Sequence, residues 1–600
     1  MERDDVKRYY ENRKRQFQDL FHNEKRILLY LSILRSAIFI SGLVVTILLF
    51  REGILAGFLS LGSFASLFGI LLKTYAGRSW NMEFYSKLII LNENELSGLA
   101  GDFSFFDAGD RYSDPSHNFS HDIDLFGPSS FYQYINRTCT DQGSDLLAGW
   151  LGDPFGIRTG FDKRREAIRE LIALPEWRQK FIALGMVNRP GKEDTEKFKA
   201  WLSEPPVFSD SKFFRVMIYL LPAITILLLL LLILNMVHYT LFVFPFLIDL
   251  LVVTVKLKDI NRIHRLVSKQ YNFLSTFQSL IAHLENNPFN SEFLSELQGG
   301  LSGEGISAVK RVKKLSRIIQ AFDNRLNMIV GVIIDGLFLW DYHCIIKLEK
   351  WKEQASHLLP VWFENIGIVD GLISLSGYGF NNPDYCFPDL SDGSVYLDAR
   401  NLGHPLLPWE IRVLNDFNAP CNGIINIITG ANMSGKSTFL RTVVINLVMA
   451  MIAAPVCATR FLFTPAKLFS SMRTSDSLSE HESYFFAELK RLKLLKEELE
   501  RGTKIFFVLD EILKGTNSKD KSEGSWLFIE KVIMYGGTGL VATHDILLGK
   551  LAEKYPSNVM NKCFEIDIEE EDVNFDYILR EGITTRMNAA LLMKQQGIID

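Results

Sequence analysis

One segment near residue 430 restricts the fold more than any other part of the sequence. Residues 426–429 form a short apolar run that is typical of a buried strand, and the run breaks at Gly430. The residues from there to Ser437 fit the pattern G-x-x-x-x-G-K-S, and a helical pattern begins directly afterwards. In this order, strand, loop and helix form a site where backbone N–H groups surround phosphate. The segment therefore predicts an α/β domain that binds a nucleotide.

The loop residues indicate how ATP and Mg²⁺ would be held. Lys436 would reach the β- and γ-phosphates, and the Ser437 hydroxyl would ligate Mg²⁺. The rest of the loop would wrap the phosphates with its backbone. The residues predicted to bind ATP here are Gly430, Ala431, Asn432, Met433, Ser434, Gly435, Lys436, Ser437 and Thr438.

Two later strand patterns supply acidic residues and a histidine. Residues 504–509 form a buried-strand run that ends in Asp510 and Glu511, and residues 538–542 form another that precedes Thr543 and His544. We assign Asp510 to Mg²⁺, Glu511 to the attacking water and His544 to sensing of the γ-phosphate. Alone, the acids are more typical of solvated residues and the histidine of a structural one. Their order after the loop favours catalysis, with Glu511, His544 and Lys436 as the catalytic set.

Apolar residues make up 48% of the chain and are concentrated in two pairs of runs. Residues 27–50 and 54–72 form the first pair, and residues 216–237 and 240–255 form the second. Because a helix crosses a bilayer with about 20 apolar residues, we predict two transmembrane helical hairpins. The first and fourth runs fit less well, and a buried core helix is the alternative, above all for the fourth run with Asp249.

Basic residues flank both predicted hairpins on one side. Arg26 and Lys73 border the first hairpin, and Arg215 and Lys256 border the second. The positive-inside rule then predicts a multi-pass protein of the inner (cytoplasmic) membrane with its soluble parts in the cytoplasm. The six cysteines are scattered, which fits buried thiols in a reducing compartment. The net charge of -5 gives no global basic field, so nucleic-acid binding would depend on a local patch.

The three nucleotide motifs together resemble the MutS family of DNA mismatch-repair ATPases, which belong to the ABC class. Residues 427–441 are similar to the family's TGPNMxGKST-x-LR pattern, and residues 510–520 to its DEIGRGTSTxD pattern. Two upstream pairs, His404-Pro405 and Asn415-Asp416, are similar to further family landmarks. Residues 124–167 and 367–390 resemble parts of the helical lever domain.

The resemblance also implies a partner subunit. Residues 476–489 resemble the signature segment, which in ABC-class dimers contacts the nucleotide of the other subunit. Ser483 would then complete the opposite site, and the chain would act as a homodimer. His481 and Glu482 depart from the small or basic residues usual there. Arg412 stands near the family's aromatic position for adenine, so the sequence names no adenine-stacking residue.

The expected fold class is an ABC-class α/β P-loop ATPase domain that follows an all-α lever domain and carries two transmembrane hairpins. No segment ahead of residue 27 fits the family's mismatch-reading domain. The expected regions are a basic cytoplasmic leader (1–26), hairpin one (27–72), the start of the lever (73–215), hairpin two (216–255), the helical lever and core (256–390) and the ATPase domain (391–600).

The leading functional hypothesis is a membrane-tethered ATP hydrolase that works as a dimer and couples ATP to binding of duplex DNA, with mismatched DNA included. The alternative is an ABC-type membrane ATPase that acts on lipid or a membrane protein without DNA. A basic stretch over residues 310–325 suits phosphate contact, a solvated helix face or anionic lipid. Residues 328–340 are short for a span and include Asp335, so we expect a packed helix there.

Overall fold

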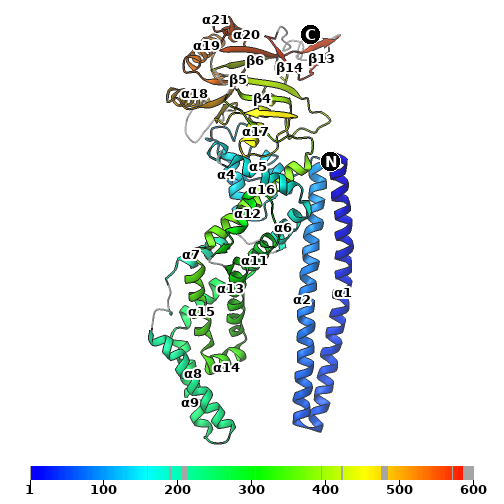
Figure 1. The fold of residues 1–600 in the computed structure, drawn as a ribbon, viewed down its shortest axis with the longest axis vertical. Helices are drawn as coiled ribbons and strands as arrows, with labels where there is room; N and C mark the ends of the chain where they lie inside the picture. Colours follow the sequence, from blue (N-terminus) through cyan, green and yellow to red (C-terminus); the bar gives the residue numbers. More distant parts are fainter. Residues whose placement is uncertain are drawn as a thin grey trace.

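The protein is elongated, with an α/β domain at one end and two helical legs that extend toward the other (Figure 1). The computed structural model describes residues 2–157, 160–187, 192–205, 208, 212–268, 271–303, 306–393, 395–420, 423–473, 484–569 and 572–584. A helical region joins the two ends, and the predicted order of helical and α/β parts is confirmed.

The first leg is a pair of antiparallel helices. Helix α1 (Arg3–Glu52) and helix α2 (Ile54–Leu99) reverse direction at Gly53. The basic residues before position 27 and the first apolar run therefore lie on one continuous helix. Gly42 lies against the ring of Phe64, where a Cβ would come within 2.8 Å of the ring. The lack of a side chain lets the two helices approach closely near the apolar tip.

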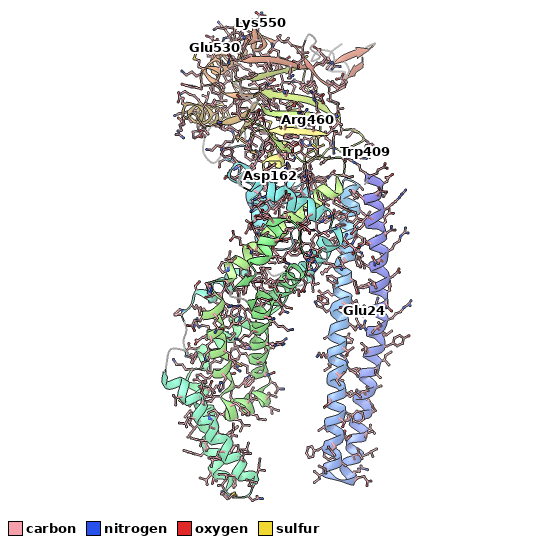
Figure 2. All side chains as sticks on the ribbon, in the orientation of Figure 1. Glu24, Asp162, Trp409, Arg460, Glu530 and Lys550 are labelled. Atoms are coloured by element: carbon pink, nitrogen blue, oxygen red, sulfur yellow. The ribbon has the colours of Figure 1, made fainter. Side chains whose placement is uncertain are left out.

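The upper end of this leg is attached to the rest of the protein. Arg3 forms an ion pair with Asp384 at 2.8 Å and lies over the ring of Trp409, which Figure 2 labels beside the start of α1. Glu95 of α2 pairs with Arg137 at 2.6 Å, and both side chains are buried. Helix α2 also contacts α6 (Pro175–Val187). The leg is thus docked on the helical region at one end, while Ile54 and Leu55 at its tip are exposed.

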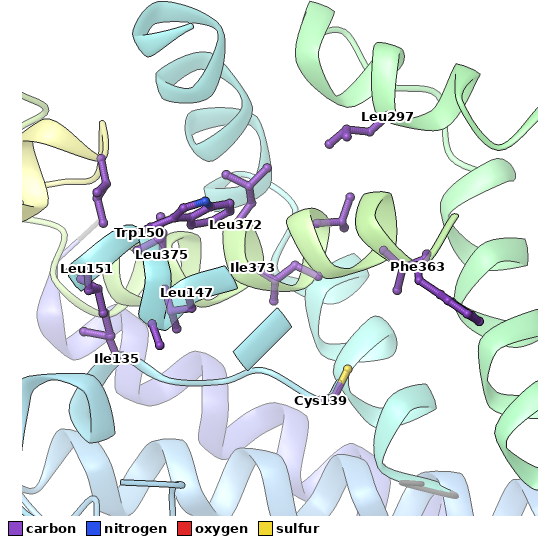
Figure 3. Close-up of a cluster of buried hydrophobic side chains, with 14 of the residues drawn as sticks. Ile135, Cys139, Leu147, Trp150, Leu151, Leu297, Phe363, Leu372, Ile373 and Leu375 are labelled. Carbon is purple, nitrogen blue, oxygen red and sulfur yellow. The ribbon is translucent and has the colours of Figure 1, made fainter. Parts of the chain in front are cut away.

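Helix α16 (Leu359–Asn381) forms the centre of the helical region. Its apolar side chains pack against α4 (Asp141–Gly152), where Leu147 and Trp150 face Leu372 (Figure 3). The remaining helices here are α3 (Phe131–Ile135), α5 (Phe161–Ile172), α7 (Lys192–Ser203), α10 (Leu257–Ser268), α11 (Tyr271–Glu285), α12 (Glu292–Gly299), α13 (Ala308–Asp323) and α15 (Trp340–Ala355).

A buried carboxylate ties α4 to α16. Asp370 accepts hydrogen bonds from the backbone N–H groups of Cys139 and Thr140 and from the Thr140 hydroxyl at 2.6 Å. Burial raises the pKa of this carboxyl to about 6, although these hydrogen bonds oppose the shift. Asp370 therefore fixes the beginning of α4 to the middle of α16.

The second leg consists of α8 (Lys212–Ile233), α9 (Tyr239–Val255) and α14 (Met328–Phe338). Asp249 of α9 is buried and accepts a hydrogen bond from the Thr225 hydroxyl of α8 at 2.7 Å. The expectation of a packed helix at residues 328–340 is wrong for one face of α14, where Met328 is 81% and Ile329 is 73% exposed. The reason is that α14 packs one side on α8 and α9, whereas apolar side chains also lie on its other side.

Among the residues that the structure describes, three helices are long and apolar enough to cross a membrane: α1, α2 and residues 216–233 of α8. Two bent helix pairs, α9 with α10 and α14 with α15, would raise this number to five if each pair formed one span. The apolar ends of both legs lie at the same end of the molecule, opposite the α/β domain (Figure 1).

The α/β domain contains two sheets. The six-stranded sheet has the order β14-β11-β6-β10-β9-β8, in which only the β14 edge is antiparallel. Its strands are β6 (Ile425–Gly430), β8 (Lys467–Ser471), β9 (Ile505–Asp510), β10 (Thr538–Thr543), β11 (Val559–Phe564) and β14 (Leu579–Glu581). The three central strands are buried throughout, as expected for a parallel sheet covered on both faces.

Smaller elements complete the structure. A second sheet has the order β3-β7-β4-β5 and lies between the helical region and the larger sheet. It contains β3 (Asp389–Leu390), β4 (Val395–Leu402), β5 (Asn415–Pro420) and β7 (Arg460–Phe463). The helices of the domain are α17 (Lys436–Met451), α18 (Tyr484–Glu500), α19 (Ser518–Met534), α20 (Ile546–Gly549) and α21 (Leu551–Lys554). Two short hairpins, β1 (Ser302–Gly303) with β2 (Ile306–Ser307) and β12 (Asp567–Glu569) with β13 (Asp572–Asn574), lie elsewhere.

Candidate functional site

The glycine-bounded loop lies between strand β6 and helix α17, as the sequence predicts. Gly435 has a φ of 97°, in the left-handed region that favours glycine, and Met433 has a φ of 68°. Lys436 Nζ donates to the carbonyl oxygens of Gly430 and Ala431, each at 2.7 Å. The lysine therefore lies along the inner side of the loop, next to the first turn of α17.

Neighbouring strands bring the acidic residues to this loop. Strand β10 pairs with both β6 and β9, so the carboxyl ends of all three strands meet at one edge of the sheet. The Ser437 hydroxyl donates to Asp510 Oδ2 at 2.6 Å. His544 Nδ1 lies 3.3 Å from Glu511 Oε1. The structure thus gathers the predicted metal ligands and the predicted catalytic acid and histidine around the loop.

Charged neighbours set the protonation of Glu511. Burial raises the pKa of its carboxyl, but the His544 ring and the Lys514 and Lys521 ammonium groups outweigh burial and lower it overall. The Lys521 ammonium lies 4.0 Å from Glu511 Oε2. Glu511 is therefore ionised near neutral pH and can accept a proton or a hydrogen bond from water.

The turn that carries Glu511 is held by a residue that the sequence interpretation did not single out. Glu511 and Leu513 have φ values of 54° and 60°, which are unfavourable for residues with side chains. Glu488 of helix α18 is buried and accepts the backbone N–H of Leu513 at 2.6 Å and that of Lys514 at 3.1 Å. These two bonds help to stabilise the strained turn. No signal in the sequence reveals this contact, because it joins residues 25 positions apart.

A cavity of about 570 Å³ opens beside the loop. Its lining includes the charged Lys436 and Glu511 and the apolar or aromatic Leu407, Ile411 and Tyr577. The volume lies within the usual range of small-molecule sites, and a lining with both charged and apolar residues suits a nucleotide.

Tyr577 lines this cavity together with Phe439 and Phe564, and the sequence interpretation gave it no role there. Asn415 holds it in place, because its Nδ2 donates to the Tyr577 carbonyl at 3.0 Å and its Oδ1 accepts from the Leu579 N–H at 2.7 Å. Arg412 is turned away from the cavity and donates to the Leu407 carbonyl and the Tyr385 hydroxyl. The only feature of the sequence that could have indicated Tyr577 is its position as an aromatic residue just before strand β14.

These residues fit ATP and Mg²⁺. Mg²⁺ is usually bound through one or two protein oxygens together with phosphates and water, and the Ser437 hydroxyl and Asp510 carboxylate provide such a pair. Among the described residues there is no cluster of three or more metal-binding side chains. The hydroxyl of Ser434 is buried within the loop without a hydrogen-bond partner. A polar ligand in the loop would satisfy it.

The predicted signature segment cannot be located in the same way. Ser483 lies outside the described residues, as do residues 474–482 before it. Its assignment to the site of a second subunit remains a prediction. Helix α18 begins at Tyr484, so its first turns, with Glu488, contain the described end of this segment.

The helical region contacts the α/β domain close to the site. Asp124 lies between two arginines, Arg441 of α17 at 2.9 Å and Arg473. Asp122 accepts the Arg473 backbone N–H at 2.8 Å and the Ser470 hydroxyl at 2.5 Å. A short segment before α3 therefore joins the helix after the nucleotide loop to the end of strand β8.

The fold and the site define a helical region followed by a mixed α/β domain of the kind associated with ATPases. Residues 426–594 match the family model described as MutS domain V. This part of the chain is thus similar to the MutS family.

Individual relatives match over a limited part of their length. The DNA mismatch repair protein MutS of Thermotoga petrophila is 30% identical over 255 residues, which are 42% of this chain and 31% of the relative. The MutS protein homolog 4 of Homo sapiens is 25% identical over 320 residues, which are 51% of this chain and 32% of the relative. The chain thus spans about a third of the length of these curated relatives.

Proposed function

We propose that this chain is an ATP hydrolase that binds ATP with Mg²⁺ in the cavity beside residues 430–438. The observation that carries the proposal is that Lys436, Ser437 and Glu511 line one cavity, with Asp510 bonded to Ser437 and His544 beside Glu511. The direct test is Mg²⁺-dependent release of phosphate from ATP by the purified full chain in detergent. No release above background would contradict the proposal.

Each side chain has a distinct part in the proposed reaction. Lys436 and the loop N–H groups hold the phosphates, and Ser437 with Asp510 would hold Mg²⁺. Bound Mg²⁺ would neutralise charge on the phosphate oxygens. Glu511 orients a water molecule and accepts its proton while the water oxygen bonds to the γ-phosphorus and the bond to ADP breaks. His544 keeps the Glu511 carboxylate ionised and oriented.

Glu488 should act as a positioning residue for Glu511. Replacement of Glu488 by Gln removes one of two strong acceptors from the strained turn. We expect kcat to fall by about tenfold, the loss expected for a misoriented general base worth about 1.4 kcal/mol, with little change in KM. Steady-state ATPase kinetics measure this result. The matched control is Glu497→Gln on the same helix, where the acid forms an ion pair with Lys493, and equal loss in both variants would contradict the assignment.

We further propose that two copies of the chain act together and that ATP changes the position of the helical region. The dimer rests on the resemblance of residues 476–489 to the signature segment. The coupling rests on the contact of Asp124 with Arg441, one turn after Ser437, and with Arg473 at the root of that segment. Movement of α17 on nucleotide binding would be transmitted through Asp124 toward α3 and α4.

The two legs support a proposal that the protein is anchored in the inner (cytoplasmic) membrane. Their apolar ends lie together at one end of the molecule and expose large apolar side chains, whereas the ATP site lies at the other end (Figure 1). Exposed apolar surface of this extent is unfavourable in water and favourable in lipid. Basic residues beside both hairpins favour a cytoplasmic ATP site.

Duplex DNA, including mismatched DNA, is the leading candidate for what the ATP cycle acts on, because a relative is named as a DNA mismatch repair protein. Helix α13 offers an exposed basic face. The basic residues of this face are Lys310, Lys313, Lys314 and Arg317. Within the described part of the chain, none of these four side chains has an ion-pair partner. The alternative is action on lipid or a membrane protein without DNA.

A salt titration separates these alternatives. Replacement of the four basic α13 residues by Gln should weaken duplex DNA binding by the detergent-solubilised protein. The slope of log affinity against log salt should shrink by up to about 3.6, at roughly 0.9 for each phosphate contact. Fluorescence anisotropy at several salt concentrations measures both quantities. Lys490→Gln with Lys493→Gln on α18 serves as control, and absence of DNA binding by the unmodified chain at low salt would contradict the DNA proposal.

A further inference from the structure

Helix α14 has an apolar face that nothing in the described structure covers. Met328 and Ile329 are 81% and 73% exposed, and Val332 and Ile333 are exposed one turn later. The helix packs its other face on α9 and α8. Figure 1 shows it across the lower ends of α13 and α15 rather than parallel to them. Its exposed face is therefore continuous with the apolar surface of the second leg.

Two contacts fix the level of α14 along that leg. The Tyr342 hydroxyl, in the first turn of α15, donates to the Val252 carbonyl at 3.0 Å, near the end of α9. Gly336 lies against the ring of Phe246, where a Cβ would come within 2.2 Å. The two α9 positions are six residues apart, which corresponds to about 9 Å along a helix. Gly336 of α14 thus lies beside a point of α9 that is about 9 Å closer to the apolar tip, along the helix, than Val252.

This contact places one side of α14 beside the part of α9 that would lie in the membrane, as expected for a helix in the membrane interface. Such helices lie in the membrane plane with their apolar face about 5–10 Å into the boundary between headgroups and acyl chains. Lys256 and Lys258 follow α9 directly and would mark the headgroup level if α9 enters the bilayer at Val255. Trp340 follows α14, donates to the Ala321 carbonyl at 2.7 Å and carries Lys347 over its ring. Tryptophan and lysine are common at this level of a membrane.

Polar contacts hold α14 in this orientation. The bend between α14 and α15 is 79°, and Leu339 at the bend has a φ of 47°. Asp335 accepts the backbone N–H of Asp341 at 2.9 Å, and Arg325 pairs with Asp341 at 3.0 Å. These contacts join the end of α13 to the beginning of α15 across α14. The apolar face is thereby presented by a braced helix.

We infer that α14 is an interfacial helix that rests in the cytoplasmic boundary of a phospholipid bilayer, with Met328, Ile329 and Val332 among the acyl chains. This inference rests on the proposed membrane anchorage and extends it. Helix α14 would fix how far the second leg enters the bilayer. It would also keep the basic face of α13 on the water side, within reach of anionic headgroups.

Spin labels on the full chain in phosphatidylcholine–phosphatidylglycerol vesicles test this inference. Single labels are placed at Met328→Cys and Ile329→Cys, with Leu251→Cys on α9 as the hairpin reference and Lys313→Cys on α13 as the aqueous reference. The unmodified chain gives the background from native cysteines. Collision rates are measured with oxygen, which concentrates in lipid, and with a water-soluble nickel chelate. We expect oxygen-to-nickel ratios at 328 and 329 several-fold above that at 313.

The outcomes distinguish this inference from the membrane proposal. Preference for nickel at 328 and 329, with preference for oxygen at 251, overturns the interfacial helix and leaves the hairpin in the membrane. Preference for nickel at 251 as well overturns the anchorage itself, and the inference with it. Shielding of 328 and 329 from both reagents means that protein covers α14, which also overturns the inference.

Discussion

Replacement of Glu511 by Gln should leave ATP and Mg²⁺ bound while hydrolysis falls by a factor on the order of 10² to 10⁴, the range expected for loss of a general base. The amide keeps the size and the strained turn of Glu511 but cannot accept the proton of the attacking water. The Ser437–Asp510 pair and Lys436 are unchanged, so affinity should be retained. Single-turnover hydrolysis and binding of a fluorescent ATP analogue measure the two effects separately.

The controls for this variant use the same domain. Glu523→Gln alters an exposed acid on α19 and should have normal turnover. ATP trapped by Glu511→Gln should also increase the dimer fraction in light scattering if two copies close around nucleotide. Unchanged turnover in Glu511→Gln would show that another group activates the water.

The same assay has a predicted pH dependence. The pKa of Glu511 lies below its ordinary value, so turnover should persist as pH falls until the carboxylate is protonated at that lowered pKa. His544→Ala removes a group that lowers this pKa, so the acidic limb of the rate profile should move to higher pH. A limb that does not move would mean that His544 does not act through Glu511.

Local patterns were sufficient to predict the centre of the site. Each of the motifs around Ser437, Asp510 and His544 follows a buried strand, and a parallel sheet brings the ends of such strands together. Tyr577 and Glu488 could not be predicted in this way. Their contacts depend on how the last strand and α18 fold back onto the loop, which no short pattern encodes.

The helical parts show the same limit. Apolar runs predicted the two hairpins, but they could not reveal that α1 continues without a break from Arg3, because helical propensity differs little between its charged and apolar halves. Amino-acid composition also could not predict that one face of α14 is exposed. Its apolar residues suit a core and a membrane surface equally, and only the three-dimensional contacts separate the two faces.

Replacement of Lys436 by Ala should weaken ATP binding by about 1.5–3 kcal/mol, the usual contribution of a charged hydrogen bond, or roughly 10- to 150-fold in Kd. Lys436 is buried beside the cavity, where its ammonium group is the positive charge that faces the loop and the acids Asp510 and Glu511. Removal also leaves the carbonyls of Gly430 and Ala431 without their donor, so the loop should lose its phosphate-binding shape.

Isothermal titration with ATP and Mg²⁺ measures the loss, and Lys550→Ala on the exposed surface of the same domain is the matched control (Figure 2). Comparison of Lys436→Ala with Glu511→Gln tests whether Lys436 acts in binding of ATP and Glu511 in its hydrolysis. If the cavity works as proposed, Lys436→Ala loses binding and Glu511→Gln loses only turnover, although both side chains line the same cavity. Full ATP affinity in Lys436→Ala would mean that the nucleotide binds elsewhere, and the proposed roles of Ser437, Asp510 and Glu511 would fail with it.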